Sequence, residues 1–326
     1  MNIVVIGLGS MGKRRIRLLQ KYDNSMKIIG VDCDKERRKQ IENQSHIITY
    51  ADIEAVYKME NVDCAFIASS PLSHADLINK CLRFDWHVFT EINLVNTLYE
   101  ENVELAREKN RTLFLSSTFL YRREIEFIKQ KVKRCHNKIN YLYHTGQYLP
   151  DWHPWESYKD FFVGNKETNG CRELMAIEFP WIIDIFGKIE RFTVISSKVS
   201  SLEINCADSY MLMFEHEGGN KGAVALDVVS RKASRNLEVF GEELYLTWDG
   251  TPKGLRCYDY ENRTDVEISL YKDVERNMNY CETIIEDAYF YEIVNFFHVI
   301  NGVETAKYSF SKDVDVLKLI EEIEVG

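Results

Sequence analysis

A glycine-rich segment near the amino terminus constrains the fold of this chain more than any other feature. Residues 2–6 are mostly apolar and are predicted to form a buried strand, and residues 13–21 have the pattern of a helix. Between them lies Gly7-Leu-Gly-Ser-Met-Gly12. In such a turn Gly7 permits the sharp bend, Gly9 lets the backbone approach a ligand, and Gly12 lets helix and strand pack closely. This strand–turn–helix unit predicts a dinucleotide-binding domain on a parallel sheet.

The second predicted strand, residues 27–31, ends at Asp32. A carboxylate there accepts hydrogen bonds from both ribose hydroxyls and repels a 2′-phosphate, so we expect NAD as the cofactor and NADP as the less favoured one. Arg37 and Arg38 lie nearby, and their positive charges weaken the expected preference for NAD over NADP. The alternative is a glycine-rich turn in an unrelated α/β protein. The predicted cofactor-binding residues are Gly7, Gly9, Ser10, Met11, Gly12, Asp32, Ser70, His74 and Glu91.

Strand and helix patterns alternate over the first 120 residues, and the texture changes after that. We predict an α/β protein with an N-terminal Rossmann domain, a doubly wound parallel sheet, over residues 1–120. Residues 121–326 are predicted to form an α+β domain with a large, mostly antiparallel open sheet, whose final helices pack back on the first domain. The last two helices are expected over residues 282–300 and 314–323, and strands of the second sheet over 139–147, 192–197, 210–215, 222–229, 236–240 and 243–248.

Composition excludes several classes of protein. The 326 residues carry a net charge of −10, which argues against a nucleic-acid-binding surface. The eight cysteines are scattered without any Cys-x-x-Cys, so neither a disulfide framework nor a metal site is expected. The apolar residues 1–7 are too few for a signal peptide or a membrane span. We therefore expect a cytoplasmic protein that binds neither nucleic acid nor membrane.

Further segments follow the glycine turn in a recognisable order. They are Ser69-Ser-Pro-Leu-Ser-His74, His87-Val-Phe-Thr-Glu91, Tyr121-Arg122 and residues 170–187. With these segments the chain resembles the Gfo/Idh/MocA family over essentially its full length. The resemblance implies a Rossmann domain, an open-sheet second domain, and hydride transfer between NAD(P) and a hydroxyl carbon of a sugar, cyclitol or related compound.

Two positions depart from the family pattern. The chain has Glu91-Ile92-Asn93 where the family usually has Glu-Lys-Pro, and the resemblance implies that this Lys assists proton transfer. On the helix after Gly170 the family has a carboxylate and, four residues later, a His; here they are Glu173 and Ile177. Isoleucine neither donates nor accepts protons. We therefore expect a rearranged acid/base site.

The aromatic segment 147–159 offers replacement chemistry. Tyr148 and Trp152 suit the apolar faces of a sugar, and His153 is the best candidate general base in the segment, with Tyr158 a possible proton donor. Packing of the segment on the second domain, or a subunit contact, is an equally weighted alternative, and a lone His in such a loop is more often structural.

Charged residues elsewhere complete the predicted site. Arg172 and Glu173 are expected to bind substrate because they open the helix after Gly170, unless they form a local ion pair on a solvated face. Arg122 suits an anionic or polyhydroxylated ligand, with an interdomain salt bridge as the alternative. Glu91 is expected to contact the ribose or the nicotinamide amide of the cofactor rather than to act as a base, although it is the nearest ionisable replacement for the missing Lys. The catalytic candidates are therefore Glu173, His153 and Glu91, and the substrate-binding candidates are Arg122, Tyr148, Trp152, Arg172 and Glu173.

The prediction is an NAD-dependent oxidoreductase that acts on a sugar, sugar nucleotide or related polyhydroxylated compound. The alternative is a redox-silent sensor or partner protein that keeps the same pockets. We further predict a homodimer or homotetramer through the open sheet of the second domain, with apolar residues of 222–229 and 236–240 facing outward.

Overall fold

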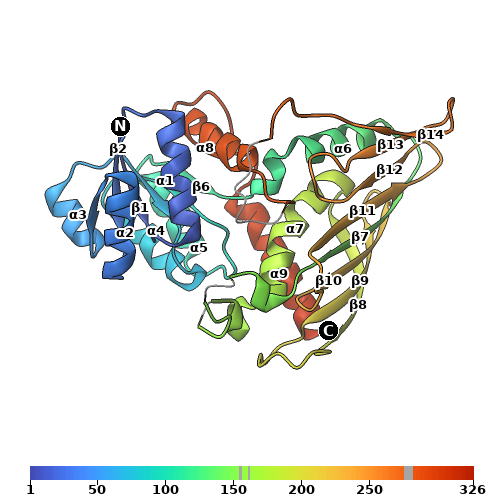
Figure 1. The fold of residues 1–326 in the computed structure, drawn as a ribbon, viewed down its shortest axis with the longest axis horizontal. Helices are drawn as coiled ribbons and strands as arrows, with labels where there is room; N and C mark the ends of the chain where they lie inside the picture. The colour runs from blue at the N-terminus through green and yellow to red at the C-terminus, as the bar shows by residue number, and fades with distance from the viewer. Residues whose placement is uncertain (154–155, 161, 275–281) are drawn as a thin grey trace. The chain divides into compact units, whose positions relative to one another are not determined.

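The computed structural model describes residues 1–153, 156–160, 162–274 and 282–326 (Figure 1). The chain divides into two compact units. Unit 1 comprises residues 1–118 and 289–314, and unit 2 comprises residues 119–288 and 315–326. Within the described residues, no helix combines the length and the apolar character needed to cross a bilayer.

Unit 1 contains a parallel sheet of six strands in the order β3-β2-β1-β4-β5-β6. The order reverses between β1 and β4, and in such sheets ligands bind outside the carboxyl ends of the strands at that point. The strands are β1 (Asn2–Ile6), β2 (Lys27–Val31), β3 (Ile48–Tyr50), β4 (Cys64–Ile67), β5 (His87–Thr90) and β6 (Leu113–Leu115). The helices between them are α1 (Ser10–Tyr22), α2 (Lys35–Ser45), α3 (Ile53–Met59), η1 (Pro71–Ser73), α4 (His74–Arg83) and α5 (Tyr99–Glu108).

A helix from far along the chain completes the core of unit 1. Helix α8 (Glu286–Ile300) places Phe296 edge-on against Phe66 of β4, Phe89 of β5 and Phe114 of β6. Each such pair adds about 0.5–1.5 kcal/mol beyond the burial of its surface. The sheet of unit 1 is therefore covered in part by residues that follow the first segment of unit 2, residues 119–288, in the sequence.

Unit 2 contains a sheet of eight strands in the order β14-β13-β12-β11-β7-β10-β9-β8. Only β7 and β10 pair in parallel, so the sheet is mostly antiparallel, as predicted. The strands are β7 (Asn140–Gly146), β8 (Ile189–Ser197), β9 (Ser209–His216), β10 (Lys221–Asp227), β11 (Ser234–Phe240), β12 (Tyr245–Trp248), β13 (Arg256–Asp259) and β14 (Thr264–Glu267).

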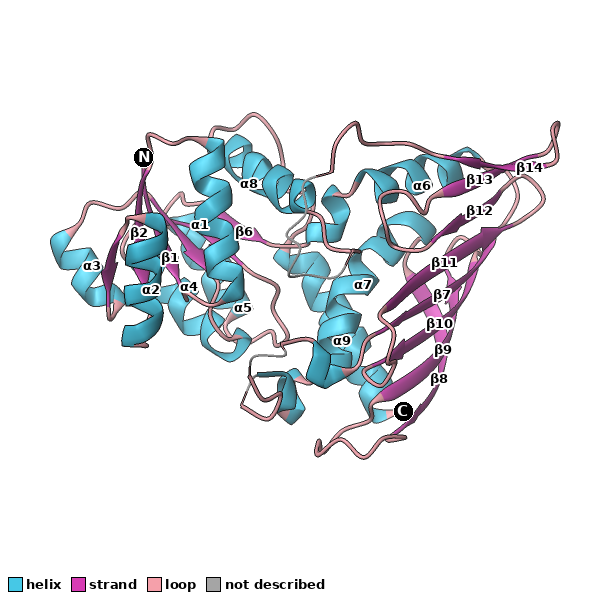
Figure 2. Cartoon of the chain, in the orientation of Figure 1, coloured by secondary structure: helices cyan, strands magenta, loops and turns pink. Residues whose placement is uncertain are grey.

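Helices α6 (Arg123–Arg134) and α7 (Gly170–Phe186) lie on the same side of this sheet (Figure 2). Short 3₁₀ turns precede them in the sequence or connect them: η2 (Thr118–Tyr121), η3 (Leu149–Asp151), η4 (Phe162–Gly164) and η5 (Lys166–Thr168). Helix α9 (Phe310–Val325) ends the chain. It begins before the predicted residue 314 and is longer than the sequence pattern indicated.

The opposite face of the eight-stranded sheet is open. Ile195 is 72% exposed, Met211 56% and Met213 58%. A groove of about 820 Å³ crosses this face. Of the apolar residues of 222–229 and 236–240 that were predicted to face outward, Ala223 and Ala225 line this groove. Side chains alternate along a strand, and the larger apolar residues of these two strands point to the core; they are Val224, Leu226, Leu237 and Val239.

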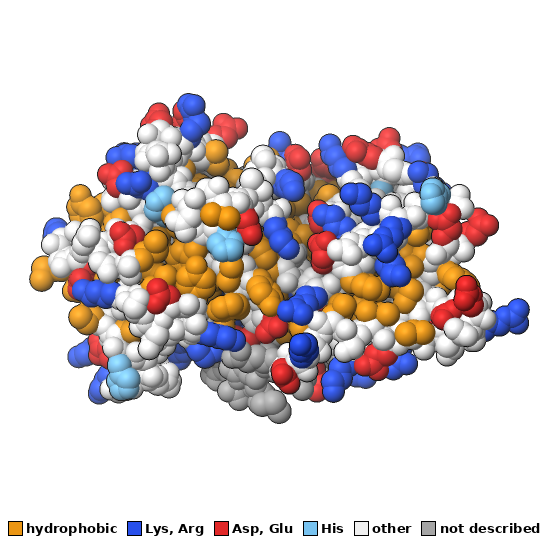
Figure 3. Space-filling model, turned by 90° about the horizontal axis from the view of Figure 1, so that it is seen from above, with side chains coloured by type: hydrophobic (Ala, Val, Ile, Leu, Met, Phe, Trp, Pro, Cys, Tyr) orange, Lys and Arg blue, Asp and Glu red, His pale blue; other side chains and the backbone are white. Residues whose placement is uncertain are grey.

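On the face drawn in Figure 3, acidic and basic side chains are interspersed and no broad basic region is present.

Candidate functional site

The three glycines of the β1–α1 turn have different structural roles. Gly7 has φ +91°, and a Cβ there would lie 2.6 Å from the carbonyl oxygen of Ala68. A Cβ on Gly12 would lie 1.9 Å from the carbonyl oxygen of Gly7. Beside Gly9, in contrast, a Cβ would meet no atom within 4 Å. The fold itself thus requires Gly7 and Gly12, whereas Gly9 keeps a space open at the surface of the turn.

That space lies at the start of helix α1. Gly9 is the N-cap residue, no side chain caps the helix, and its first turn contains no acidic residue. The amino end of a helix carries a partial positive charge and backbone N–H groups that favour an anion. The turn therefore fits a pyrophosphate, which a side chain at position 9 would obstruct.

Asp32 lies beside the same turn and joins two loops. Its Oδ2 accepts a hydrogen bond from the Leu8 amide at 2.8 Å, and its Oδ1 accepts one from the Asp34 amide at 2.8 Å. A carboxylate has about four acceptor positions, so two remain for ribose hydroxyls. Arg38 donates to the carbonyl oxygens of Asp32 and Cys33, at 2.7 and 3.1 Å. Its guanidinium is thus held by backbone atoms.

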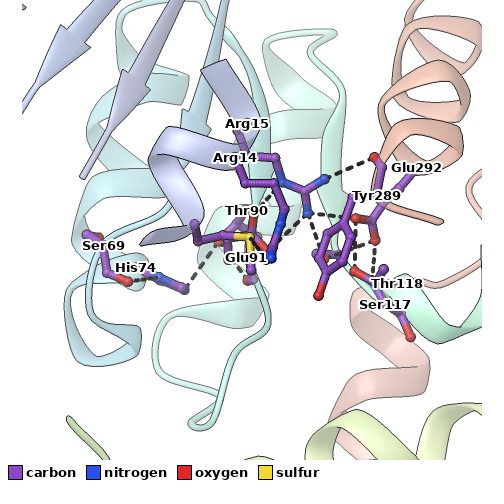
Figure 4. Close-up of polar contacts among 12 residues, drawn as sticks. Arg14, Arg15, Ser69, His74, Thr90, Glu91, Ser117, Thr118, Tyr289 and Glu292 are labelled. Atoms are coloured by element: carbon purple, nitrogen blue, oxygen red, sulfur yellow. Dashed lines mark hydrogen bonds and ion pairs between the residues drawn. The ribbon is translucent and has the colours of Figure 1, made fainter. Parts of the chain in front are cut away.

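Glu91 belongs to a buried charged cluster at the carboxyl ends of β5 and β6 (Figure 4). Arg15 of α1 contacts Glu91 at 2.5 Å and Glu292 of α8 at 2.7 Å. Burial alone would lower the pKa of Arg15, but the two carboxylates raise it and keep the guanidinium charged. Burial also raises the pKa of Glu292. Glu292 accepts further hydrogen bonds from Ser116 Oγ, the Ser117 amide and Thr118 Oγ1.

This cluster fixes Glu91 as an ion-pair partner. Both of its carboxylate oxygens contact Arg15, at 2.5 and 3.1 Å. The carboxylate that was predicted to replace the missing Lys is therefore engaged by a cation. Ile92, the next residue, is half-buried.

The other cofactor candidates follow β4. Ser70 is exposed, and its carbonyl oxygen accepts hydrogen bonds from Ser73. His74 is 1% exposed and lies beneath the same loop, where both ring nitrogens contact protein atoms. Ser10 and Met11 are half-buried in the first turn of α1.

Glu173 of α7 is the candidate acid in unit 2. Its Oε2 is buried without a hydrogen-bond partner among the described residues. Burial raises the pKa of Glu173 from 4.5 to about 8. The carboxyl is therefore mostly protonated near pH 7 and is able to donate a proton. Ile177, one helical turn later, adds no titratable group.

The two arginine candidates are engaged by carboxylates within unit 2. Arg172 contacts Glu324 and, at 3.5 Å, Glu321, both on α9. Arg122 contacts Glu124 at 2.7 Å and packs over the Trp248 ring, 4.9 Å from its centroid. Both arginines are buried, at 6% and 2% exposure. Their ion pairs lie within one unit, not on a solvated face.

The aromatic segment is organised by its own contacts. Trp152 Nε1 donates to the Gln147 carbonyl oxygen at 3.0 Å, and Tyr148 lies under the Arg231 guanidinium, 3.7 Å from its ring centroid. His153 Nδ1 lies 2.7 Å from Glu156 Oε1. The Tyr158 hydroxyl accepts a hydrogen bond from a backbone amide at 3.0 Å. Residues 154 and 155 of this segment, and residue 161 just after it, lie outside the described residues.

The sequence interpretation missed Arg15, Glu292 and Asn93. Arg15 follows Gly12 by three positions on the buried side of α1, and Glu292 lies within the apolar stretch of α8. A charged residue on an apolar helical face was the available signal, because such a residue must find a partner when it is buried. Asn93 was noted only as a loop residue.

Comparison with known proteins identifies relatives of the chain. A model of the Gfo/Idh/MocA family, described as an oxidoreductase family with an NAD-binding Rossmann fold, matches residues 1–117. Biliverdin reductase A of Mus musculus is 31% identical over 215 residues, which span 65% of this chain and 64% of that protein. Myo-inositol 2-dehydrogenase of Thermotoga maritima is 26% identical over 132 residues, 40% of either chain.

Solved structures share the fold of the whole chain at low identity. Levoglucosan dehydrogenase in complex with NADH and L-sorbose has a TM-score of 0.81 at 12% identity and covers 99% of this chain and 95% of its own. Biliverdin reductase from Synechocystis sp. PCC 6803, in complex with biliverdin and NADP⁺, has a TM-score of 0.75 at 14% identity, covering 99% and 97%. Residues 1–117 thus match the Gfo/Idh/MocA family of oxidoreductases, and the chain as a whole shares the fold of these solved structures.

Proposed function

We propose that the protein is an NAD(P)-dependent oxidoreductase. The observation that carries this proposal is the β1–α1 turn, which is open beside Gly9 and ends at a helix without a capping side chain. The bound dinucleotide supplies the hydride chemistry. In this chain the turn holds the pyrophosphate, and Asp32 binds the ribose.

NAD is the proposed cofactor, with NADP less favoured. Asp32 is 8% exposed, and a carboxylate at this position disfavours a 2′-phosphate. Arg38 donates to backbone carbonyl oxygens. Relatives of the same fold are known with each cofactor, NADH in levoglucosan dehydrogenase and NADP⁺ in the Synechocystis reductase.

Glu173 is the proposed proton-handling residue. One oxygen of its carboxyl has no hydrogen-bond partner in the part of the chain that the structure describes, and burial raises its pKa to about 8. Glu91 is paired with Arg15, and His153 contacts Glu156. Without any general acid or base, proton transfer would be slower by roughly 10²–10⁴-fold. Glu173→Gln keeps the shape of the side chain and removes the exchangeable acid.

A polyhydroxylated, sugar-like compound is the proposed substrate. The relationship to myo-inositol 2-dehydrogenase and the fold shared with levoglucosan dehydrogenase support it. A second candidate reaction is the reduction of a conjugated acceptor. Ile92 and Ile177 favour it because neither side chain can take a proton from an alcohol, and biliverdin reductase A matches the longer part of the chain.

A second copy of the chain is the proposed partner for the open sheet face of unit 2. The groove there is floored by Ala223 and Ala225 and flanked by Met211 and Met213. Apolar ridges and a small-residue groove suit two-fold packing of sheets. Sedimentation equilibrium of the native protein and of Met211→Glu tests this: a native dimer or tetramer that dissociates in the variant is expected, and a native monomer contradicts it.

A single-turnover assay tests the function. Native protein is mixed with stoichiometric NAD or NADH and a panel of sugars, sugar nucleotides, sugar acids and conjugated tetrapyrroles, and reduced-nicotinamide absorbance is followed. Substrate-dependent change is expected for the native protein and not for Gly9→Ala. If NAD binds but nothing reacts, the redox-silent sensor replaces the enzyme. Activity gained only in Ile92→Lys would indicate a dehydrogenase whose proton transfer has been lost.

A further inference from the structure

His74, the first residue of α4, connects two loops at the carboxyl edge of the unit 1 sheet. Its Nε2 lies 3.0 Å from the carbonyl oxygen of Ser69, which follows β4. Its Nδ1 lies 2.8 Å from the side-chain amide of Asn93, which follows β5. Figure 4 shows the ring of His74 between Ser69 and the end of β5. The ring is 1% exposed, so these contacts take the place of water.

The protons of this pair follow from its geometry. The Ser69 carbonyl oxygen only accepts hydrogen bonds, so Nε2 of His74 must carry a proton. Burial lowers the pKa of His74, which favours the neutral ring and leaves Nδ1 as an acceptor. Two side chains face Nδ1: the Asn93 amide at 2.8 Å and Thr90 Oγ1 at 3.4 Å, whose hydroxyl donates to the Glu91 carbonyl oxygen. The amide N–H₂ of Asn93 is therefore the donor that we assign to Nδ1. With Oδ1 toward the ring, the buried Nδ2 faces the Tyr99 hydroxyl and makes no hydrogen bond of normal geometry within the described residues; a 180° rotation of the amide directs it to Nδ1.

The residue whose carbonyl His74 contacts, Ser69, also belongs to the peptide that lies against the dinucleotide turn. A Cβ on Gly7 would lie 2.6 Å from the Ala68 carbonyl oxygen and 2.7 Å from the Ser69 amide nitrogen. β1 and β4 are neighbours at the reversal of strand order, where such sheets bind their ligand. A shift of the Ser69 peptide would therefore move an atom that touches the turn.

We propose that Asn93 and His74 are positioning residues for the dinucleotide: Asn93 keeps the proton of His74 on Nε2, and His74 holds the Ser69 carbonyl in place beside the Gly7 turn. This inference rests on the proposed dinucleotide binding. It also gives Asn93 a role that the Pro of the family pattern does not fill, because proline has no side-chain donor.

Three variants of the full chain test the pair. Asn93→Ala removes the donor to Nδ1. Asn93→Asp replaces it with an acceptor, which holds a doubly protonated ring and so preserves the Ser69 contact. Asn96→Ala is the matched control, since Asn96 is an exposed residue of the same loop. The dissociation constant for NADH is measured by fluorescence, and the protonation of His74 by ¹⁵N NMR of the imidazole nitrogens.

The expected results separate this inference from the proposed function. Native protein shows the Nε2–H tautomer, Asn93→Ala weakens NADH binding about tenfold, as the loss of one buried hydrogen bond implies, and Asn93→Asp and Asn96→Ala bind within about threefold of native. An Nδ1–H tautomer in the native protein, or equal binding by Asn93→Ala and Asn96→Ala, overturns the inference alone. A native protein that binds neither NADH nor NADPH overturns the proposed function and this inference together.

Discussion

Arg15 Nη2 and Glu292 Oε2 lie 2.7 Å apart, and both side chains are fully buried. The two residues are 277 positions apart in the sequence. Because Arg15 also contacts Glu91, one guanidinium joins α1, the end of β5 and α8. Removing one partner of such a buried ion pair strongly destabilises the protein, because the other partner then remains as an uncompensated buried charge.

Glu292→Gln is expected to destabilise the protein by about 3–5 kcal/mol. The amide loses the charge opposite Arg15 and places an N–H₂ group among hydrogen-bond donors such as the Ser117 amide. Urea unfolding measures the change. Glu104→Gln, which breaks an exposed pair with Arg107, is the control and should leave the unfolding free energy almost unchanged. Equal changes in unfolding free energy for the two variants would show that the buried cluster stabilises the protein no more than an exposed ion pair does.

Gly9→Ala and Gly12→Ala should separate ligand binding from folding. A Cβ at position 9 meets no atom within 4 Å, so Gly9→Ala should fold normally and lose most dinucleotide binding. A Cβ at position 12 would lie 1.9 Å from the Gly7 carbonyl oxygen, so Gly12→Ala should unfold at a lower temperature. Thermal unfolding and NADH titration of both variants measure this. Unchanged NADH affinity in Gly9→Ala would contradict the placement of the pyrophosphate.

Glu173→Gln should gain stability relative to the native protein as the pH rises. The pKa of Glu173 is about 8 in the folded protein and near 4.5 when unfolded, so the folded state binds this proton more tightly. Its stabilisation is present below pH 4.5 and is lost as the pH rises through 8. Between pH 6.5 and pH 8.5 the difference in unfolding free energy should shift by roughly 2 kcal/mol in favour of the variant. A constant difference over this range would mean that the carboxyl is already ionised at pH 6.5.

Asp313→Asn should show the same direction in a lower pH window. Asp313 is buried and accepts hydrogen bonds from the hydroxyls of Tyr99 and Tyr308, at 2.5 and 2.9 Å. Burial raises its pKa from 3.8 to about 6. The native protein should lose roughly 2 kcal/mol relative to Asp313→Asn between pH 4 and pH 6, and almost nothing further above pH 7. A continued change above pH 7 would assign the effect to another group.

Much of the fold could be predicted from the sequence because the sequence patterns that indicate its elements are local. The turn from Gly7 to Gly12 and the apolar strands of unit 1 each predict their own structure. Strands β13 and β14 were not predicted, and Thr264–Glu267 shows why: all four residues are exposed, so the strand has no apolar alternation to detect. Pairing with a neighbouring strand, which a local pattern does not show, forms it.

The candidate site was less accessible because its contacts are non-local. Arg172 was predicted to bind substrate, but it contacts Glu324, which lies 152 positions later in the sequence. His74 and Asn93 are 19 residues apart on different loops, and only the parallel order of β4 and β5 brings them together. Glu173 was correctly singled out as a carboxylate of interest, while its unpartnered oxygen is visible only in three dimensions.

The division of unit 1 into residues 1–118 and 289–314 has a consequence for synthesis. When a ribosome has released the first 118 residues, the sheet still lacks Phe296, and Arg15 still lacks Glu292. The amino-terminal part of unit 1 therefore remains incompletely covered while some 170 further residues are translated. At the usual rates of translation this takes roughly ten to thirty seconds. Exposed aromatic surface over that interval is where a chaperone would act on this chain.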